Sequence, residues 1–223
     1  MLMQWIRTCR YRALYARFQP YTMLHRRRYA ANLRLVYNYR HVPGAVVECG
    51  TWRGGMIAGI ASLLGPDRAY YLFDSFEGLP DAQPLDGEKA LAWQRHGPAS
   101  GAHQNCRADR AEAEAAMQRS GARNVHIVKG WFADTLASYD GGAIAVLRLD
   151  ADWFESTMQC LEHLFDRVAP GGLVILDDYY TWAGCARAVH TFLATHKRPE
   201  TIRVYRNEVP FLVRREDDGT DDA

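Results

Sequence analysis

Residues 146–182 read VLRLDADWFESTMQCLEHLFDRVAPGGLVILDDYYTW, and this stretch decides the fold. An apolar run that is typical of a buried strand covers residues 144–149, and a helix-like segment follows it. A Pro-Gly-Gly sequence at residues 170–172 breaks the helical pattern, and a second apolar run covers residues 173–176. Two apolar runs joined by a helix predict a strand, a helix and a second strand that lies parallel to the first in one sheet.

Both predicted strands end in carboxylates. Asp150 follows the first strand, and Asp177 and Asp178 follow the second. Open parallel sheets bind ligands outside the carboxyl ends of their strands, so we expect these three side chains to converge on one crevice. Clustered carboxylates repel one another unless their pKa values rise or a hard cation such as Mg²⁺ binds them. The alternative is that they only end strands and cap a turn, and three acids on one unit favour the metal site.

The composition predicts one globular domain without a strong charge preference. With 223 residues, of which 48% are hydrophobic, the chain can bury one substantial core, and its net charge of +1 gives no reason to expect nucleic acid or membrane as a partner. The charge is unevenly spread, since residues 1–47 contain nine Arg and no acid, whereas residues 216–223 contain five acids and no base. A basic arm of this kind can dock on a second subunit, so we expect a homo-oligomer, most simply a dimer.

The cysteines and the hydropathy pattern predict a cytoplasmic protein. Five scattered cysteines form no CxxC pair and no Cys/His pattern with zinc spacing. No apolar run approaches the roughly 18 residues that cross a bilayer, and the first residues lack the apolar region of a secretory signal. We expect a helical segment at residues 1–40, broken at Gln19-Pro20, a main domain at residues 41–215, and a disordered acidic tail at residues 216–223.

A glycine-rich loop follows the first predicted strand. The sequence AVVECGTWRGG gives a short buried strand at residues 45–49, and then Gly50, Gly54 and Gly55 lead into a helix. Glycines allow backbone to approach a ligand closely at the N-terminus of a helix. The spacing GxxxGG differs from the dinucleotide and phosphate-loop patterns. Glu48, beside this loop, would repel a pyrophosphate and suits a ligand that carries positive charge.

The second predicted strand, at residues 69–73, ends in Asp74. An acid at this distance beyond the glycine loop is placed to accept hydrogen bonds from ribose hydroxyls, although a single Asp at a strand end can also be a structural cap. Together with Glu48 it indicates a nucleoside site with room for a cationic appendage. S-adenosylmethionine has this chemistry, since it joins adenosine to a sulfonium and an ammonium group.

Five stretches now carry a specific resemblance. In chain order, VVECGTWRGG, LFDSFEGLP, VKGWFADTL, LRLDADWFEST and PGGLVILDDYYTWAGCARAV resemble the macrocin O-methyltransferase family, over roughly residues 20–213. Members of this family use S-adenosylmethionine to methylate sugar hydroxyls of natural products. The resemblance implies a Rossmann-like class I methyltransferase fold, with a seven-stranded, mostly parallel sheet, an antiparallel last strand and helices on both faces. It also implies a need for Mg²⁺ and oligomer formation.

The resemblance also assigns roles to residues. The loop after the strand at residues 125–128 contacts adenine in this class, and the small Gly130 beside the flat Trp131 would fit a ring, although Trp131 as a core residue is equally open. The metal ligands would be Asp150, Asp177 and Asp178. The predicted cofactor-binding residues are Glu48, Cys49, Gly50, Thr51, Asp74, Ser75, Gly130, Trp131 and Asp150.

Two positions depart from the family pattern. The related catechol O-methyltransferases place a basic Lys three residues after the first metal Asp, and here that position is Trp153, which could instead stack on an acceptor ring. The general base is therefore open among Asp150, the best-placed acceptor, Asp152 and His96. The usual Asp-Gly-Asp of the family has Ala151 in the middle, and since alanine needs no positive φ we expect an ordinary turn.

Residues 80–105, PDAQPLDGEKALAWQRHGPASGAHQN, are rich in Pro, Gly and polar residues and show little strand or helix pattern. A segment of this length without regular structure is either a lid or disordered. It follows the proposed ribose strand and would hang over the crevice, so we favour a substrate lid. His96 lies in it, although a histidine in a loop is more often solvated than catalytic.

The sequence therefore predicts an O-methyltransferase that depends on S-adenosylmethionine and Mg²⁺ and acts on a small hydroxyl acceptor, most simply a sugar of a glycosylated natural product. The alternative is a non-catalytic nucleoside-binding or scaffolding protein that retains the fold. A descendant of that kind would not need the clustered Asp150, Asp177 and Asp178. The missing GxGxxG disfavours an NAD-dependent oxidoreductase.

Overall fold

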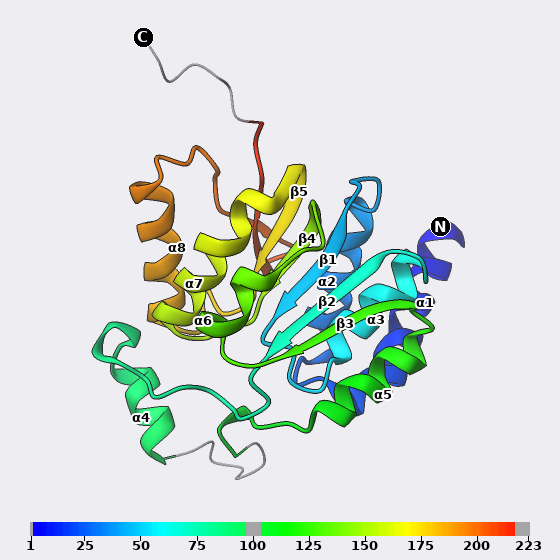
Figure 1. Ribbon diagram of the computed structural model, residues 1–223. Helices are drawn as coiled ribbons and strands as arrows, with labels where there is room; N and C mark the ends of the chain where they lie inside the picture. Colours follow the sequence, from blue (N-terminus) through cyan, green and yellow to red (C-terminus); the bar gives the residue numbers. More distant parts are fainter. Residues whose placement is uncertain (1, 97–103, 217–223) are drawn as a thin grey trace.

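The computed structural model describes residues 2–96 and 104–216. Its centre is one seven-stranded sheet with the strand order β3-β2-β1-β4-β5-β7-β6 (Figure 1). Strand β7 runs in the opposite direction to the other six strands, as predicted for the last strand of the class I methyltransferase fold. The strands are β1 Ala45–Cys49, β2 Ala69–Asp74, β3 Asn124–Lys129, β4 Ile144–Leu149, β5 Val168–Leu176, β6 Arg203–Tyr205 and β7 Val209–Val213.

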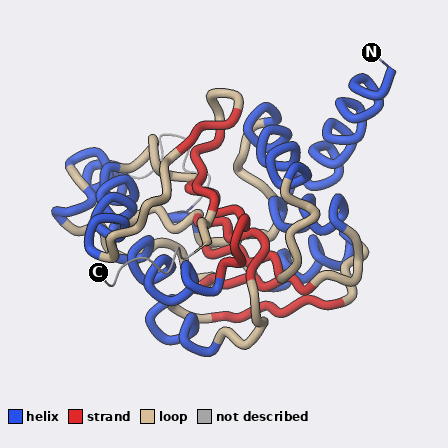
Figure 2. The backbone as a smooth tube through the Cα atoms, turned by 90° about the horizontal axis from the view of Figure 1, so that it is seen from above, coloured by secondary structure: helices blue, strands red, loops and turns tan. Residues whose placement is uncertain are grey.

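Helices cover both faces of the sheet, so that the molecule has three layers (Figures 1 and 2). One face carries α1, α2, α3 and α5, and the other carries α6, α7 and α8. Side chains of a strand alternate between the faces, so Val46 of β1 packs into the first core and Val47 into the second. The helices are α1 Leu2–Phe18, α2 Arg26–Asn38, α3 Gly55–Leu64, α4 Glu88–His96, α5 Arg110–Ser120, α6 Phe132–Thr135, α7 Phe154–Leu164 and α8 Ala183–Thr195.

The central strands are buried on both faces, as their continuous apolar sequences predicted. Every residue of β1 and of β4 is buried. Complete burial of an aliphatic side chain stabilises a fold by about 1.5–3 kcal/mol, so these strands fix the centre of the molecule. Their parallel register also fixes the edge at which both strands end, since Cys49 of β1 pairs with Leu149 of β4.

The two N-terminal helices belong to the same core as the sheet. They are separated at Gln19–Tyr21, where the sequence predicted a break. Tyr29 of α2 is fully buried, and its hydroxyl donates to the Gly55 carbonyl at 2.9 Å, at the start of α3. A Cβ atom on Gly59 would collide with that hydroxyl, so glycine is required where the two helices meet. The N-terminal segment thereby supports the glycine-rich loop.

Two elements differ from the prediction. Residues 80–105 contain α4, because Ala90 and Trp93 pack on a tryptophan cluster that local sequence does not reveal. Strand β5 starts at Val168, before the Pro-Gly-Gly sequence, whereas the prediction placed this strand at residues 173–176. Residues 97–103 and 217–223, which include most of the predicted acidic tail, lie outside the described residues. Within the described ranges, no helix has the length and apolar character that a membrane span needs.

Candidate functional site

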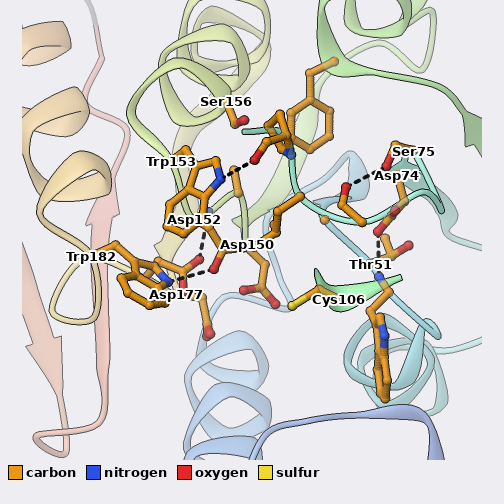
Figure 3. A pocket seen from close by; sticks show the side chains of 18 of the residues that line it. Thr51, Asp74, Ser75, Cys106, Asp150, Asp152, Trp153, Ser156, Asp177 and Trp182 are labelled. Carbon is orange, nitrogen blue, oxygen red and sulfur yellow. Dashed lines mark hydrogen bonds between the residues drawn. The ribbon is translucent and has the colours of Figure 1, made fainter. Parts of the chain in front are cut away.

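A cavity of about 650 Å³ opens at the carboxyl ends of β1, β2, β4 and β5 (Figure 3). This volume is in the range of small-molecule sites. The loops that follow these strands supply one side of its wall. Much of the rest comes from Tyr21 and Thr22, between α1 and α2, from the segment from Gly78 to Trp93, and from the loop after β3. The cavity thus lies where parallel sheets bind their ligands.

Asp150, Asp177 and Asp178 come together in this cavity. Each offers a carboxylate oxygen, and these oxygens lie within 4.8 Å of one another. Asp150 is half-buried, and the other two are buried. The parallel pairing of β4 with β5 explains the arrangement, because it brings the ends of both strands to one edge. This spacing and donor set fit a hard divalent cation.

Arg148, in β4, is a site residue that the sequence analysis missed. Its side chain is 1% exposed and lies among three carboxylates. Nη1 is 2.8 Å from an oxygen of Glu48 and 2.8 Å from an oxygen of Asp150, and Nη2 is 2.7 Å from an oxygen of Asp177. The only signal in the sequence was a charged residue inside an apolar strand, two positions before Asp150.

Burial dominates the electrostatics of this cluster. It raises the pKa of Glu48 to about 8, against the opposing attraction of Arg148. Burial also raises the pKa of Asp177, and it raises that of Asp178 well above the ordinary value, with Asp152 adding repulsion. The cluster holds more carboxyl groups than guanidinium groups. A cationic ligand that binds among them would favour their ionised form and oppose these shifts.

A second basic residue reaches the cluster from the N-terminal region. Arg28 of α2 places its Nε 3.5 Å from an oxygen of Asp177 and donates to the carbonyl of the same residue. His25, next to the N-terminus of α2, is exposed, and it accepts a hydrogen bond from the Arg28 amide. Helix α2 is thus tied to the end of β5 and helps to hold Asp177.

Unpaired polar atoms mark the part of the cavity beside the glycine-rich loop. Glu48 Oε2 and Thr51 Oγ1 are buried, and neither has a hydrogen-bond partner among the described residues. Buried polar groups are normally paired, so both atoms are suited to a polar ligand. Gly50 has a φ of 81°, and a Cβ there would collide with the Asp150 carbonyl, so this loop requires glycine where β1 meets β4.

Asp74 lines the cavity and is also a structural cap. Its two oxygens accept from the amides of Trp52 and Phe76, each at 2.7 Å. Burial raises its pKa, and these amide hydrogen bonds oppose the shift. Ser75 lies beside it, and its hydroxyl donates to the Gly78 carbonyl at 3.0 Å. Both predicted interpretations of Asp74 are therefore compatible with the structure.

Gly130 and Trp131 line the cavity after β3. Trp131 is 39% exposed, so the alternative that it is a core residue is wrong. Gly130 has a φ of 149°, and its amide donates to the Asp74 carbonyl at 3.0 Å. An exposed aromatic ring at the cavity edge suits a flat ligand group.

Two predicted site residues do not enter the cavity. Cys49 is fully buried in the core under β1, because its side chain points to the opposite face from Glu48. His96 is exposed at the last position of α4 and is not among the residues that line the cavity. The expectation that these side chains form part of the site is therefore corrected.

The segment before α4 is anchored to α7. Asp86 is 2% exposed, and one of its oxygens accepts from the Phe154 amide at 2.6 Å while the other accepts from the Gln83 amide at 2.7 Å. Asp86 thereby caps the N-terminus of α7 from outside the helix. The indole of Trp153 donates to the Pro80 carbonyl at 2.9 Å. These contacts make residues 80–96 a wall of the cavity.

Trp153 is 1% exposed, so its ring is packed into the wall of the cavity. It is not free to stack on an acceptor ring as predicted. Its ring packs edge-on against Trp182 at 5.2 Å and Trp93 at 6.3 Å. Beside it, Asp152 has a φ of 56°. Alanine at position 151 led us to expect an ordinary turn, but the next residue, Asp152, adopts the left-handed conformation. Asp tolerates this conformation better than most residues.

Comparisons with known proteins agree with this geometry. The family described as Macrocin-O-methyltransferase (TylF) matches residues 9–208. The chain is 38% identical over 161 residues to the 8-demethyl-8-(2,3-dimethoxy-alpha-L-rhamnosyl)-tetracenomycin-C 4'-O-methyltransferase of Streptomyces olivaceus, covering 68% of this chain and 58% of that protein. It is 36% identical over 170 residues to the mycinamicin III 3''-O-methyltransferase of Micromonospora griseorubida, covering 70% and 62%. The matches thus span about three fifths of the length of these relatives.

Solved structures show the same fold. The O-methyltransferase NovP is 28% identical with a TM-score of 0.71, over 88% of this chain and 83% of that one. The calicheamicin methyltransferase CalS11 is 21% identical with a TM-score of 0.67, over 81% and 76%, and it shares the fold. Because the family match covers most of the chain, the protein belongs to the macrocin O-methyltransferase family.

Proposed function

We propose that this protein transfers the methyl group of S-adenosylmethionine to a sugar hydroxyl of a glycosylated natural product, with a divalent cation such as Mg²⁺ in the site. One observation carries the proposal. The cluster of Asp150, Asp177 and Asp178 shares a single cavity with the unpaired buried atoms of Glu48 and Thr51. The relatives named above are O-methyltransferases of rhamnosyl-tetracenomycin and of mycinamicin, which supports a sugar-linked acceptor.

The residues present fit the cofactor. Glu48 would accept a hydrogen bond from its ammonium group, and Thr51 would bond its amino-acid end. Asp74 would hold the ribose hydroxyls, and Trp131 would face the adenine. When bound, S-adenosylmethionine supplies the electrophilic methyl group. The acidic wall, in which Arg148 is already paired, favours a cationic cofactor over an anionic one.

The residues also fit a hard cation. Asp150, Asp177 and Asp178 offer oxygen ligands, and a cation bound among them would stabilise their ionised form where Arg148 and Arg28 alone do not. A divalent cation there supplies Lewis acidity, which lowers the pKa of an acceptor hydroxyl. The protein's part is to hold the three carboxylates at one edge of the sheet.

We assign proton removal to Asp152. Asp150 already accepts a hydrogen bond from Arg148 at 2.8 Å and belongs to the proposed cation site, whereas Asp152 lies beside the cluster and lines the cavity. Burial raises the pKa of Asp152 well above the ordinary value, with repulsion from Asp150 adding to it. A carboxylate with a raised pKa is a stronger base near neutral pH, which proton transfer from a hydroxyl needs.

Calorimetry and methyl transfer test the proposal. We expect metal-stripped protein to bind S-adenosylhomocysteine, and we expect labelled methyl to pass to p-nitrophenyl α-L-rhamnoside or another member of a glycoside panel only when Mg²⁺ is added. Asp177→Ala should lower transfer by about 100-fold or more, because it removes one cation ligand. Asp67→Ala, an exposed acid in an ion pair with Arg123, is the matched control and should retain activity.

Two results would contradict the proposal in different ways. No binding of S-adenosylhomocysteine with or without Mg²⁺ would favour the alternative of a non-catalytic scaffolding protein. Full transfer by Asp177→Ala would show that the cation site is wrong. Association through the basic N-terminal arm stays a prediction, and native mass spectrometry at micromolar concentration would test it.

A further inference from the structure

We propose that Trp182 is a positioning residue, whose indole N–H holds the Asp152 carboxylate in the orientation that receives the acceptor proton. This inference rests on the proposed function. Trp182 follows β5 and lies at the N-terminus of α8, 30 residues from Asp152 in the chain. A tryptophan side chain neither takes a proton from a hydroxyl nor binds a metal ion. Its contribution to the reaction must therefore pass through the carboxylate that it contacts.

One hydrogen bond carries the argument (Figure 3). Trp182 Nε1 donates to Asp152 Oδ1 at 2.8 Å, a short distance for an N–H bond to a carboxylate. The Asp152 amide donates to Asp178 Oδ2 at 3.2 Å, so the backbone of Asp152 is also held. With Oδ1 occupied by the indole, Oδ2 is the oxygen that can meet a substrate proton in the cavity.

The indole is itself fixed from several sides. Its ring packs edge-on against Trp153 at 5.2 Å and against Trp93 at 5.8 Å. Lys89 of α4 places its ammonium 4.9 Å from the centre of the same ring. Trp182 is 7% exposed, so it cannot change rotamer without disturbing these neighbours. A donor held in this way can orient Asp152 before any substrate binds.

An aspartate carboxylate needs a hydrogen-bond donor of this kind because its side chain can rotate. Without a partner, the carboxylate rotates about its last bond and presents either oxygen at variable angles. Proton transfer needs a hydrogen-bond distance and alignment at the moment of reaction. A misplacement of about 1 Å can cost about 100-fold in rate. The indole therefore acts on the chemical step and has little to do with the affinity for the cofactor.

Trp182→Phe tests this role, because it retains an aromatic ring in the cluster and removes the N–H. We expect kcat for p-nitrophenyl α-L-rhamnoside, or for the glycoside that the panel identifies, to fall by about 10- to 100-fold. The dissociation constant for S-adenosylhomocysteine should stay within about twofold. In the double variant Asp152→Ala/Trp182→Phe, the second substitution should add no further loss, since the indole acts only through Asp152.

Trp93→Phe is the matched control. It trims the same aromatic cluster but leaves the indole N–H of Trp182 in place, so we expect it to lower kcat less than Trp182→Phe does, with its main cost in the KM for the acceptor and in thermal stability. A Trp182→Phe variant with the kcat of the wild type would overturn the inference. So would a double variant that is much slower than Asp152→Ala, because the indole would then act by another route.

A crystal structure of Trp182→Phe decides the question even without an acceptor. We expect the Asp152 carboxylate to rotate or to occupy more than one orientation. A carboxylate that keeps its single orientation without the indole would overturn the inference. Failure of the proposed function has a different signature, since the wild-type protein would then bind no S-adenosylhomocysteine.

Discussion

Arg148 has the densest set of charged contacts in the site, and its removal should be costly. The guanidinium is 1% exposed and contacts oxygens of Glu48, Asp150 and Asp177 within 2.8 Å. Burial opposes its charge, but these three carboxylates together raise its pKa. It therefore stays ionised, and it is the cation that allows these acids to be buried in one place.

We predict that Arg148→Met lowers the free energy of unfolding by about 3–5 kcal/mol, because buried carboxylates lose their partner. Urea denaturation of metal-free protein measures this. The matched control is Arg27→Met, which breaks an exposed ion pair to Glu208 at 3.2 Å and should cost at most about 1 kcal/mol. Equal costs for the two variants would show that the cluster does not depend on Arg148.

Helix α7 depends on a residue that lies outside it. Asp86 accepts from the amide of Phe154, the first residue of α7, and from that of Gln83. We predict that Asp86→Ala costs about 2 kcal/mol or more, because a cap is lost and two amides are left in a buried place. Asp109→Ala, which removes the exposed cap of α5, should cost about 1 kcal/mol. Chemical denaturation compares the two caps.

Gly184 gives an independent test of the same contact. A Cβ at this position of α8 would lie 2.9 Å from the Phe154 amide and would collide with Asp86. We predict that Gly184→Ala lowers stability despite the higher helix propensity of alanine, by more than about 1 kcal/mol. Ala186→Gly, on the same helix, measures the propensity alone. A stabilised Gly184→Ala variant would show that this packing is loose.

For the whole molecule, the raised pKa values predict a dependence of stability on pH. The folded pKa values of Glu48, Asp152, Asp177 and Asp178 lie above their ordinary values, so the folded protein binds more protons than the unfolded chain. Stability is therefore lost as pH rises, and for Glu48 the window runs from 4.5 to about 8. Each group contributes at most about 1.4 kcal/mol per pH unit.

We predict that the melting temperature of metal-free protein is lower at pH 8.5 than at pH 6.5. Mg²⁺ should restore more stability at the higher pH, because it binds ionised carboxylates. Scanning calorimetry with EDTA or with Mg²⁺ measures both effects, and Glu48→Gln should flatten the slope. A metal-free protein that is more stable at pH 8.5 would contradict the sign.

Features that depend on residues nearby in the chain could be predicted from the sequence, and features that depend on distant contacts could not. The apolar runs of β4 and β5 and their terminal acids are local features, so their convergence was predictable from parallel pairing alone. Helix α4 and the role of Asp86 depend on contacts with distant residues, and the local composition indicated a loop. Cys49 was misassigned because motif membership does not say which face of a strand a side chain occupies.

The cap that Asp86 places on α7 also couples movement of residues 80–96 to opening of the first turn of α7. Residues 80–96 cannot move away from the cavity unless this carboxylate leaves the Phe154 amide, and the first turn of α7 then loses its cap. The rate of amide hydrogen exchange in that turn would report how often residues 80–96 move away from the cavity. A bulky acceptor that needs residues 80–96 to move aside could enter the cavity no faster than the Asp86 cap breaks.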